Sequence, residues 1–286
     1  MTWSIENRTV VVTGGNSGIG LATATELARR GADVVLTARD PMRGRAAAEL
    51  IESETGRAAT PMVLDLSSFA SIHSFADELV AKRGRVDVLV NNAGVYMSSR
   101  RLTADGHEWT MGVNHLGPFL LTCLLASDPT TRPYRIINVA SEMHRNTKHD
   151  AGFNQLDPGG RYRGTRVYSR SKLANVLFTR ELAQRLDGTD STTFAVHPGV
   201  VSTRIAQDGD SKLASVLWKG GSRWMRTPEE GAATSIYLAT EPGIEQHSGG
   251  YFSDERLIEP SAAGRDPDAV ARLWDLSAAE TGCRPR

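Results

Sequence analysis

Short runs of aliphatic and β-branched residues alternate along the chain with longer stretches of helical periodicity. The apolar runs are 9–14 (TVVVTG), 33–38 (DVVLTA), 61–65 (PMVLD), 86–92 (VDVLVNN), 134–141 (YRIINVAS) and 192–199 (TTFAVHPG). Helical patterns run through Arg30, over about 41–55 and 69–83, after Asp105 and around Tyr168. Runs that are apolar throughout are typical of parallel strands buried on both faces. The strand–helix order therefore predicts an α/β fold with right-handed crossovers and helices on both faces of a mainly parallel sheet.

The whole chain of 286 residues reads as one domain, because no internal repeat, low-complexity tract or linker divides it. Residues 142–166 are rich in Gly, Asn, His and Arg and predict a long loop. A second irregular region, 202–226, is the expected substrate loop. Its apolar residues at helical spacing, Leu213, Val216 and Leu217, fit a lid over an apolar substrate and a packed short helix equally well. Residues 253–286 form a C-terminal extension.

Composition and charge narrow the classes of function. The formal net charge is +0, which predicts neither nucleic-acid binding nor attraction to a membrane surface. Cys123 and Cys283 stand far apart without metal-ligand spacing, so we expect no disulfide framework and no metal site. The longest apolar stretch, 116–126, is too short to span a bilayer and no signal peptide is evident. We therefore expect a soluble, cytoplasmic protein with no membrane anchor.

A glycine-rich turn follows the first apolar run. Gly14, Gly18 and Gly20 in TGGNSGIG have the spacing G-x-x-x-G-x-G between the first strand and the first helix. Glycines here allow a tight turn and bring a pyrophosphate close to the helix N-terminus. The position predicts a dinucleotide site, although a plain glycine-rich turn between strand and helix is the alternative.

The end of the second apolar run bears on the choice of cofactor. An acidic residue there would bind the ribose 2′-hydroxyl of NAD and repel a 2′-phosphate. This chain instead has Thr37-Ala38-Arg39, with Arg43 one helical turn later. Two guanidinium groups favour the 2′-phosphate of NADP(H). Asp40 keeps NAD(H) open as the less favoured cofactor, and both arginines could be ordinary solvated surface charges.

Tyr168 and Lys172 lie four residues apart in VYSRSKLANVLF, on one face of a predicted helix. A free tyrosine has a pKa of about 10, which is too high for an efficient base near neutral pH. A nearby ammonium group favours the phenolate and is expected to lower the pKa of the tyrosine. Alone, the Y-x-x-x-K spacing is common by chance.

Its companions occur in one order along the chain: TGGNSGIG, the Asn91-Asn92-Ala93-Gly94 segment, Asn114, Ser141, YSRSK and Pro198-Gly199. This order resembles the short-chain dehydrogenase/reductase family over about residues 9–252. VVLTARDxxRG resembles its NADPH-dependent carbonyl reductases. YSRSKLANVLFTREL and the tail 251–281 are similar to the retinol dehydrogenase group. The resemblance implies a single-domain, Rossmann-type doubly wound, mainly parallel seven-stranded sheet.

The resemblance also implies roles for individual residues. Tyr168 would be the general acid in reduction and the base in oxidation, and Lys172 would lower its pKa and hold the nicotinamide ribose. Ser141 would hydrogen-bond the substrate oxygen, and Asn114 would hold a water in a proton relay. Asp65 would contact the adenine and Thr203 the nicotinamide carboxamide. The cofactor-binding residues would be Gly14, Asn16, Ser17, Gly18, Ile19, Gly20, Arg39, Arg43, Asp65, Leu66, Asn91, Ala93, Gly94, Tyr168, Lys172, Pro198, Gly199, Val201 and Thr203.

These features predict an NADP-dependent oxidoreductase acting on a small-molecule carbonyl or alcohol, with a lipophilic substrate. A catalytically silent NADP-binding sensor or scaffold is the alternative, which the intact Ser141, Tyr168 and Lys172 argue against. An enzyme of nucleotide-sugar chemistry would have a longer substrate domain and another glycine spacing. His144 reads as a surface polar residue, and His197 has no assigned role. Many relatives form homo-oligomers, but the helix-like segment 268–276 could cover the surface used for assembly.

Overall fold

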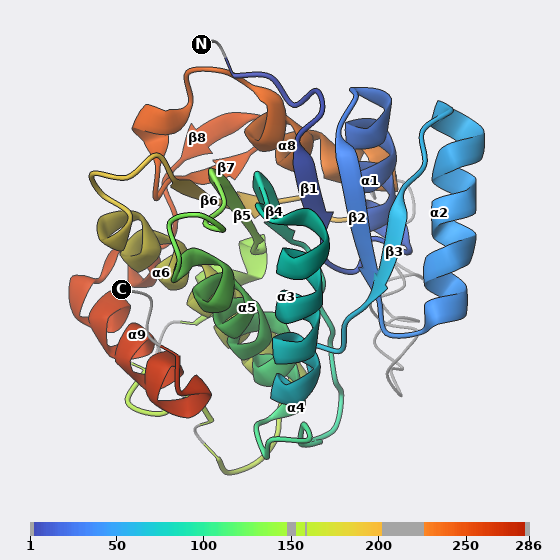
Figure 1. The fold of residues 1–286 in the computed structure, drawn as a ribbon. Coiled ribbons are helices and arrows are strands. Elements are labelled where there is room, and N and C mark those ends of the chain that lie inside the picture. Colours follow the sequence, from blue (N-terminus) through green and yellow to red (C-terminus); the bar gives the residue numbers. More distant parts are fainter. Residues whose placement is uncertain (1–2, 148–152, 158, 202–225, 284–286) are drawn as a thin grey trace.

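The computed structural model describes residues 3–147, 153–157, 159–201 and 226–283 (Figure 1). These residues form one sheet of eight strands in the order β3-β2-β1-β4-β5-β6-β7-β8. The strands are β1 (Thr9–Val12), β2 (Asp33–Ala38), β3 (Thr60–Val63), β4 (Val88–Asn91), β5 (Arg135–Val139), β6 (Thr192–His197), β7 (Tyr251–Ser253) and β8 (Arg256–Ile258). Strands β1 to β7 pair in parallel, and β8 pairs antiparallel with β7. The predicted doubly wound α/β fold is confirmed.

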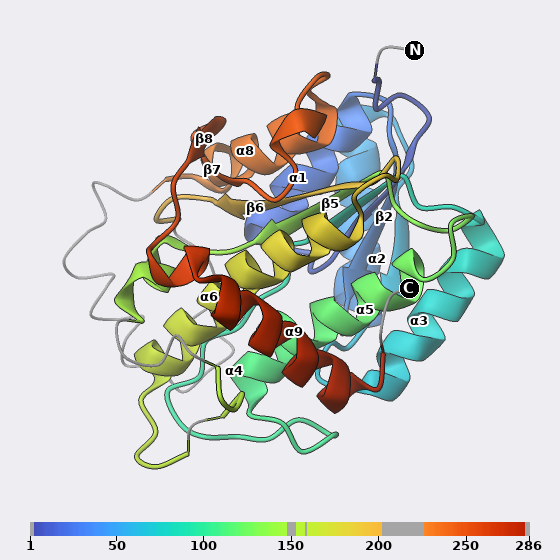
Figure 2. The same ribbon diagram turned by 90° about the vertical axis from the view of Figure 1, so that its left-hand side faces the viewer.

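Helices cover both faces of the sheet (Figures 1 and 2). On one face lie α1 (Gly18–Arg29), α2 (Pro41–Thr55) and α8 (Pro228–Thr240); on the other lie α3 (Phe69–Arg83), α5 (Gly117–Ala126) and α6 (Gly164–Arg185). A further helix, α9 (Pro267–Thr281), packs on α6 as an outer layer. The chain thus buries both faces of its central strands.

The all-apolar strands are explained by this double burial. In β1, Val10 and Val12 contribute to the core beneath α1 and α8, whereas Val11 faces the core beneath α3 and α5. All three are fully buried. Successive side chains of a strand point to opposite faces, so a strand covered on both sides needs apolar residues at every position.

The helix bounds follow from local capping signals. Asp40 precedes α2, and its carboxylate accepts the backbone N–H groups of Met42 and Arg43. Gly56 ends that helix with a φ of 69°, a left-handed conformation that glycine adopts without strain. The expected ranges 41–55 and 69–83 match α2 and α3.

The structure differs from the sequence-based expectation in three places. The sheet has eight strands rather than seven, because the start of the extension folds back as β8. The expected loop 142–166 contains η2 (Glu142–Asn146) and the first turn of α6. The extension also forms η5 (Ala263–Arg265) and α9, which is longer than the expected segment 268–276. The expected substrate loop 202–226 lies outside the described residues except for Arg226.

The connection between β4 and β5 contains a π-helix. The short helix α4 (Trp109–Met111) leads into η1 (Gly112–Leu116), which continues directly into α5. A π-helical turn accommodates one extra residue and is found mostly at functional sites. Its five residues, which include Asn114, are buried.

Candidate active site

The predicted site residues gather at the carboxyl edge of the parallel sheet. The glycine-rich turn follows β1, Arg39 follows β2, Asp65 follows β3, Gly94 follows β4 and Ser141 follows β5. The strand order reverses direction at β1 and β4, which are neighbours in the sheet. Ligands of open α/β sheets bind in the crevice at such a switch point. The structure therefore brings together residues as far apart in the sequence as Gly14 and Ser141.

The glycine-rich turn fits a phosphate group. Gly14 and Gly18 have φ angles of 64° and 52°. A Cβ on Gly20 would lie 2.3 Å from the carbonyl oxygen of Gly14 and 2.4 Å from the Asn92 amide nitrogen, so only glycine fits there. The residue before α1, Ser17, makes no side-chain capping bond to the first turn. The backbone N–H groups of that turn are therefore open to an anion. Asn16 and Ile19 belong to the same turn.

The end of β2 carries the predicted phosphate-binding arginines. Arg39 and Arg43 are both exposed. Asp40, the acidic residue between them, accepts the Met42 amide at 2.8 Å as the cap of α2, and its second oxygen lies 3.8 Å from Arg43 Nε. The carboxylate of Asp40 therefore has a structural partner of its own, and two cations flank it.

The segment after β3 is held by internal hydrogen bonds. Asp65 Oδ1 accepts from the backbone N–H and the hydroxyl of Ser67, at 2.9 and 2.7 Å. Leu66 is buried, and a Cβ on Gly117 would lie 2.7 Å from the Leu66 carbonyl oxygen. These contacts fix the turn at the cleft where the resemblance places an adenine.

Asn91 lies in the core rather than in the cleft. Its amide donates to Thr122 Oγ1 at 3.0 Å and to Asn138 Oδ1 at 2.9 Å, and the side chain is 3% exposed. Asn138 in turn donates to Thr179 Oγ1 at 3.0 Å. The polar network joins β4, β5, α5 and α6 beneath the site, so the Asn91 side chain acts as a support.

Ala93 and Gly94 line the cleft beyond β4. The backbone N–H of Ala93 donates to Thr13 Oγ1 at 3.0 Å. A Cβ on Gly94 would lie 3.4 Å from Lys172 Nζ and 3.5 Å from Asn114 Oδ1. The absence of a side chain at this position lets two of the predicted catalytic residues approach one another.

Asn114 is clamped by the chain that follows Gly94. Its side-chain oxygen accepts the Val95 N–H at 2.7 Å, and its amide donates to the Val95 carbonyl at 2.9 Å and to Ser171 Oγ at 3.0 Å. Asn114 is fully buried in the π-helix η1. The bidentate contact holds the π-helix against the segment after Gly94, and the bond to Ser171 joins it to α6, next to Lys172.

Tyr168, Lys172 and Ser141 converge at the start of α6. Lys172 Nζ lies 5.7 Å from the centre of the Tyr168 ring and donates to the Val139 carbonyl at 2.9 Å. The Ser141 hydroxyl hydrogen-bonds Tyr168, and its oxygen also accepts the Met143 N–H at 3.2 Å. The order of motifs in the sequence thus corresponds to one cluster in space.

Burial dominates the ionisation of this cluster, which corrects the expectation drawn from the sequence. Packing around the phenol raises the pKa of Tyr168 to about 12, and the Ser141 hydroxyl offsets only part of the rise. Burial lowers the pKa of Lys172 to about 8. Desolvation disfavours the charged form of both groups. The expected lowering of the Tyr168 pKa by Lys172 is not seen here, so the Tyr168 phenol is neutral at pH 7.

The end of β6 is only partly described. Gly199 has a φ of 82°, and a Cβ there would lie 2.5 Å from Arg226 Cδ. Val201 forms an isolated parallel bridge with Arg226, and the N–H of Arg226 donates to the Val200 carbonyl at 2.9 Å. Pro198 precedes this turn. Thr203 lies outside the described residues.

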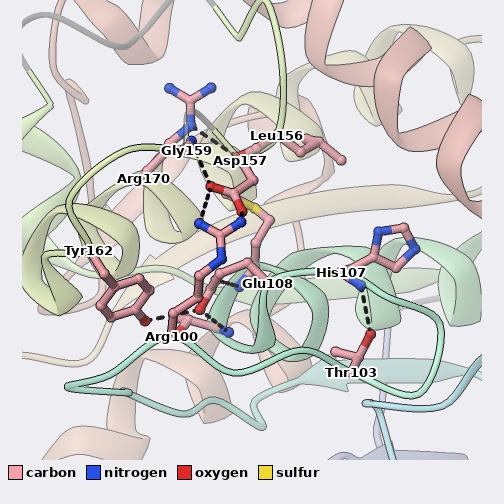
Figure 3. Close-up of polar contacts among 11 residues, drawn as sticks. Arg100, Thr103, His107, Glu108, Leu156, Asp157, Gly159, Tyr162 and Arg170 are labelled. Carbon is pink, nitrogen blue, oxygen red and sulfur yellow. Dashed lines mark hydrogen bonds and ion pairs between the residues drawn. The ribbon is translucent and has the colours of Figure 1, made fainter.

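Two loops over the carboxyl edge are joined by contacts that the sequence analysis missed (Figure 3). Arg100 pairs with Asp157 through both guanidinium nitrogens. Tyr162 donates to the buried carboxylate of Glu108 at 3.0 Å, and Glu108 also accepts the Met111 N–H at 2.8 Å. The loop before α6 is therefore fixed to the N-terminus of the helical segment that carries Asn114.

Arg170, inside the YSRSK motif, also holds the loop that precedes α6. It is 3% exposed, donates to the Gln155 carbonyl at 2.5 Å and lies over the Phe153 ring at 4.1 Å. The sequence pattern of α6 gave Arg170 no role, because only the folded loop supplies its partners. Tyr96, also missed, lies edge-on to the Tyr168 ring at 5.9 Å.

One expectation about a single residue is wrong. His144, expected as a surface residue, is fully buried. The two cysteines, far apart in the sequence, are hydrogen-bonded neighbours with free thiols in one apolar cluster. His197 accepts the Glu142 N–H at 3.1 Å.

Two features are absent from the described residues. No group of three or more His, Cys, Asp or Glu residues in that part of the chain could hold a metal ion. None of the described helices combines the length and apolarity needed to cross a bilayer.

Comparisons with known proteins agree with this geometry. Residues 8–214 match the short chain dehydrogenase family. The chain is 44% identical to human retinol dehydrogenase 12 over 98% of this chain and 88% of that protein. It is 42% identical to human retinol dehydrogenase 11, covering 96% and 86% of the two chains.

Solved structures are similar over nearly the whole fold. An uncharacterized protein from Mycobacterium paratuberculosis shares 33% identity with a TM-score of 0.80, over 100% of this chain and 97% of that one. A short chain dehydrogenase from Burkholderia cenocepacia J2315, solved in complex with NADP, shares 25% identity with a TM-score of 0.68, over 87% and 96%.

Proposed function

The chain belongs to the short-chain dehydrogenase family and is an oxidoreductase, and on that premise we propose that it transfers a hydride between NADP(H) and a lipophilic carbonyl compound or the corresponding alcohol. The observation that carries the proposal is the convergence of Tyr168, Lys172 and Ser141 at the carboxyl edge of the sheet, beside Gly94 and Asn114.

The residues around the cleft fit the parts of a dinucleotide. The uncapped first turn of α1 and the space kept by Gly20 suit the pyrophosphate. Arg39 and Arg43 suit a 2′-phosphate, and Asp65 borders the place for the adenine. Lys172 and Thr203 are proposed to hold the nicotinamide riboside. When bound, the cofactor supplies or accepts the hydride, while the protein supplies position and proton transfer.

Tyr168 is proposed as the general acid. Because its pKa is raised to about 12, its hydroxyl is protonated at neutral pH and can donate to a carbonyl oxygen. The oxygen of Ser141 accepts the Met143 N–H, so the hydroxyl proton of Ser141 can be directed at the same carbonyl oxygen. A protonated Lys172 would then return a proton towards Tyr168, with Asn114 beside it. This arrangement favours the direction of carbonyl reduction near pH 7.

The substrate class rests on the relatives and on the aromatic surroundings. Relatives at 42–44% identity are named retinol dehydrogenases, which points to retinoid-like lipophilic compounds. Tyr96 places a second aromatic ring at the edge of Tyr168, and burial raises the pKa of Tyr96 as well. An apolar, aromatic surface beside the acid suits a long hydrophobic carbonyl better than a sugar.

The test of the chemistry is NADPH consumption with all-trans-retinal and with medium-chain aldehydes. We expect Tyr168→Phe to bind NADPH as the wild type does and to lose at least about a hundredfold in kcat. Tyr237→Phe, on α8 across the sheet, serves as the matched control and should be fully active. Full turnover by Tyr168→Phe would refute the proton-transfer role. Wild-type protein that binds NADPH but reduces none of the carbonyls would instead support a sensor or scaffold.

The test of the cofactor is a pair of binding titrations. Arg39→Ala should weaken NADPH binding about tenfold or more and leave NADH binding nearly unchanged, because only NADPH carries the 2′-phosphate. Arg45→Ala, exposed two residues beyond Arg43 in α2, is the control for net charge. An equal loss for both cofactors in Arg39→Ala would remove that residue from the phosphate site.

A further inference from the structure

His144 lies three residues after Ser141 and is fully buried in η2. Its Nδ1 is 2.7 Å from the Ser141 carbonyl oxygen, and its Nε2 is 3.0 Å from the backbone nitrogen of Ser261. The Ser261 N–H can only donate, so Nε2 must be the acceptor. The ring proton is therefore on Nδ1 and is donated to the Ser141 carbonyl. Burial lowers the pKa of His144, which keeps this neutral form.

Ser261 belongs to the C-terminal extension, which contacts η2 at further points. Arg145 donates to the Glu259 carbonyl of the extension at 2.6 Å. The His144 ring also lies edge-on to Tyr251 of β7, just before the extension, at 4.9 Å. The turn after Ser261 is in turn held against α6, because a Cβ on Gly264 would lie 3.2 Å from Val176 Cγ1. The extension thus contacts η2, the segment that follows Ser141, and also packs against α6.

A second buried histidine connects the extension to the other side of the site. His115 directly follows Asn114 in the π-helix, and its Nε2 lies 2.8 Å from Ser277 Oγ in α9. The Ser277 hydroxyl donates to the Leu273 carbonyl at 2.8 Å, so it must accept from His115. Burial lowers the pKa of His115 to about 4, and this ring is neutral too.

We propose that the C-terminal segment 259–281 positions the active site, acting through His144 on Ser141 and through His115 on Asn114. The inference rests on the proposed function, because it assigns a purpose to the orientation of the Ser141 hydroxyl. The Ser141 carbonyl accepts two donors, the backbone N–H of His144 at 3.1 Å and Nδ1 at 2.7 Å. Without the ring, one donor remains, and the peptide plane that sets the direction of the hydroxyl is less restrained.

His144 is a positioning residue by this argument, since it touches neither substrate nor reacting atoms. A misplacement of about 1 Å at a reacting group can lower a rate about a hundredfold. We therefore expect His144→Phe, which keeps an aromatic ring beside Tyr251 but neither hydrogen bond, to lose about ten- to a hundredfold in kcat. The dissociation constant for NADPH should stay within about twofold, because His144 is not among the residues predicted to bind the cofactor.

The conservative variant separates positioning from packing. In His144→Asn the side-chain amide can still donate to the Ser141 carbonyl, from a position near that of Nδ1, while the contact with Ser261 is lost. We expect its kcat to lie between those of His144→Phe and the wild type, about three- to tenfold below the latter, because the donor to Ser141 is kept while the link to the extension is cut. A merely structural histidine would give the opposite order, with the smaller side chain more harmful to kcat.

A matched pair of variants in α9 tests the hydrogen bond between His115 and Ser277. Ser277→Ala removes the acceptor of His115, whereas Thr281→Ala removes a hydroxyl that makes the same i−4 bond in the same helix, to Ser277, but reaches no histidine. We expect only Ser277→Ala to lower kcat, by about three- to tenfold, when both variants are assayed well below their melting temperatures. Ser277→Ala should also melt lower than Thr281→Ala, because it leaves the buried N–H of His115 without an acceptor.

The measurements are kcat and KM for retinal, NADPH affinity and thermal unfolding of the full chain. Wild-type kcat in His144→Phe, or equal kcat in Ser277→Ala and Thr281→Ala, would overturn the corresponding half of the proposal. The Tyr168→Phe variant distinguishes a failure of the positioning role from a failure of the proposed function. If that variant is inactive while His144→Phe is fully active, only the positioning role fails. If Tyr168→Phe turns over normally, the proposed function itself fails.

Discussion

Lys172→Met should stabilise the protein while it abolishes turnover. Lys172 is 2% exposed, and burial lowers its pKa from 10.5 to about 8. One pKa unit corresponds to about 1.4 kcal/mol, so holding the ammonium in the folded state costs roughly 3 kcal/mol below pH 8. Loss of the hydrogen bond to the Val139 carbonyl offsets roughly 1 kcal/mol of that gain, since Asn175 still donates to the same oxygen. The variant should be about 2 kcal/mol more stable at pH 7.

The pH dependence has a definite sign. The folded-state pKa of Lys172 is depressed, so its contribution to stability is complete above the unfolded value of 10.5 and is lost as pH falls to about 8. Wild-type stability should therefore rise relative to the variant above pH 8, by roughly 2 kcal/mol at pH 9.5. The advantage of Lys172→Met should nearly vanish at that pH.

Urea unfolding at pH 7 and pH 9.5 measures both free energies, and NADPH consumption measures turnover. Lys82→Met is the control, because Lys82 is exposed and makes only a surface ion pair with Glu78. Its stability should change by less than about 0.5 kcal/mol at either pH. The reasoning is refuted if Lys172→Met is less stable than the wild type at pH 7, or if the difference does not shrink at pH 9.5.

Three further predictions concern residues around the site. Gly20→Ala should abolish cofactor binding and destabilise the fold by about 1–3 kcal/mol, because its Cβ would lie 2.3 Å from a backbone oxygen. The control is Gly44→Ala in α2, whose Cβ meets only contacts of 3.5 Å. This variant should be neutral or slightly stabilising in urea unfolding. Asn138→Ala should lower the unfolding free energy by about 2–3 kcal/mol, because it orphans buried partners on both sides. In a thiol titration, Cys283 should react in the native state, since its pKa is lowered and it is half-buried, while buried Cys123, whose pKa is raised, should react only after unfolding.

The parts of the fold that depend on local order could be predicted from the sequence. The bounds of α2 and α3 followed from caps and periodicity, and the strand ends placed Ser141 and Gly94 at one edge of the sheet. These signals are short-range, and the parallel topology then brings the strand ends together without further information.

The features that failed depend on tertiary partners. Burial of His144 is decided by Ser261, which lies more than a hundred positions away, and the raised pKa of Tyr168 by the desolvation that packing imposes. The spacing of Tyr168 and Lys172 predicted a charge effect on the Tyr168 pKa, whereas burial of both groups dominates their pKa values. A three-residue strand such as β8 carries too little pattern to be recognised in a sequence.

Both outer strands of the described sheet are poor templates for another chain. At one edge, β3 contains Pro61, which has no N–H to offer a neighbour. At the other edge, β8 is three residues long, begins with exposed Arg256 and runs against the direction of the rest. Short, charged or proline-containing edges discourage sheets from joining and aggregating. The antiparallel strand β8 therefore also closes this edge of the sheet to strands of other molecules. We expect concentrated solutions of the enzyme to show no association through sheet edges.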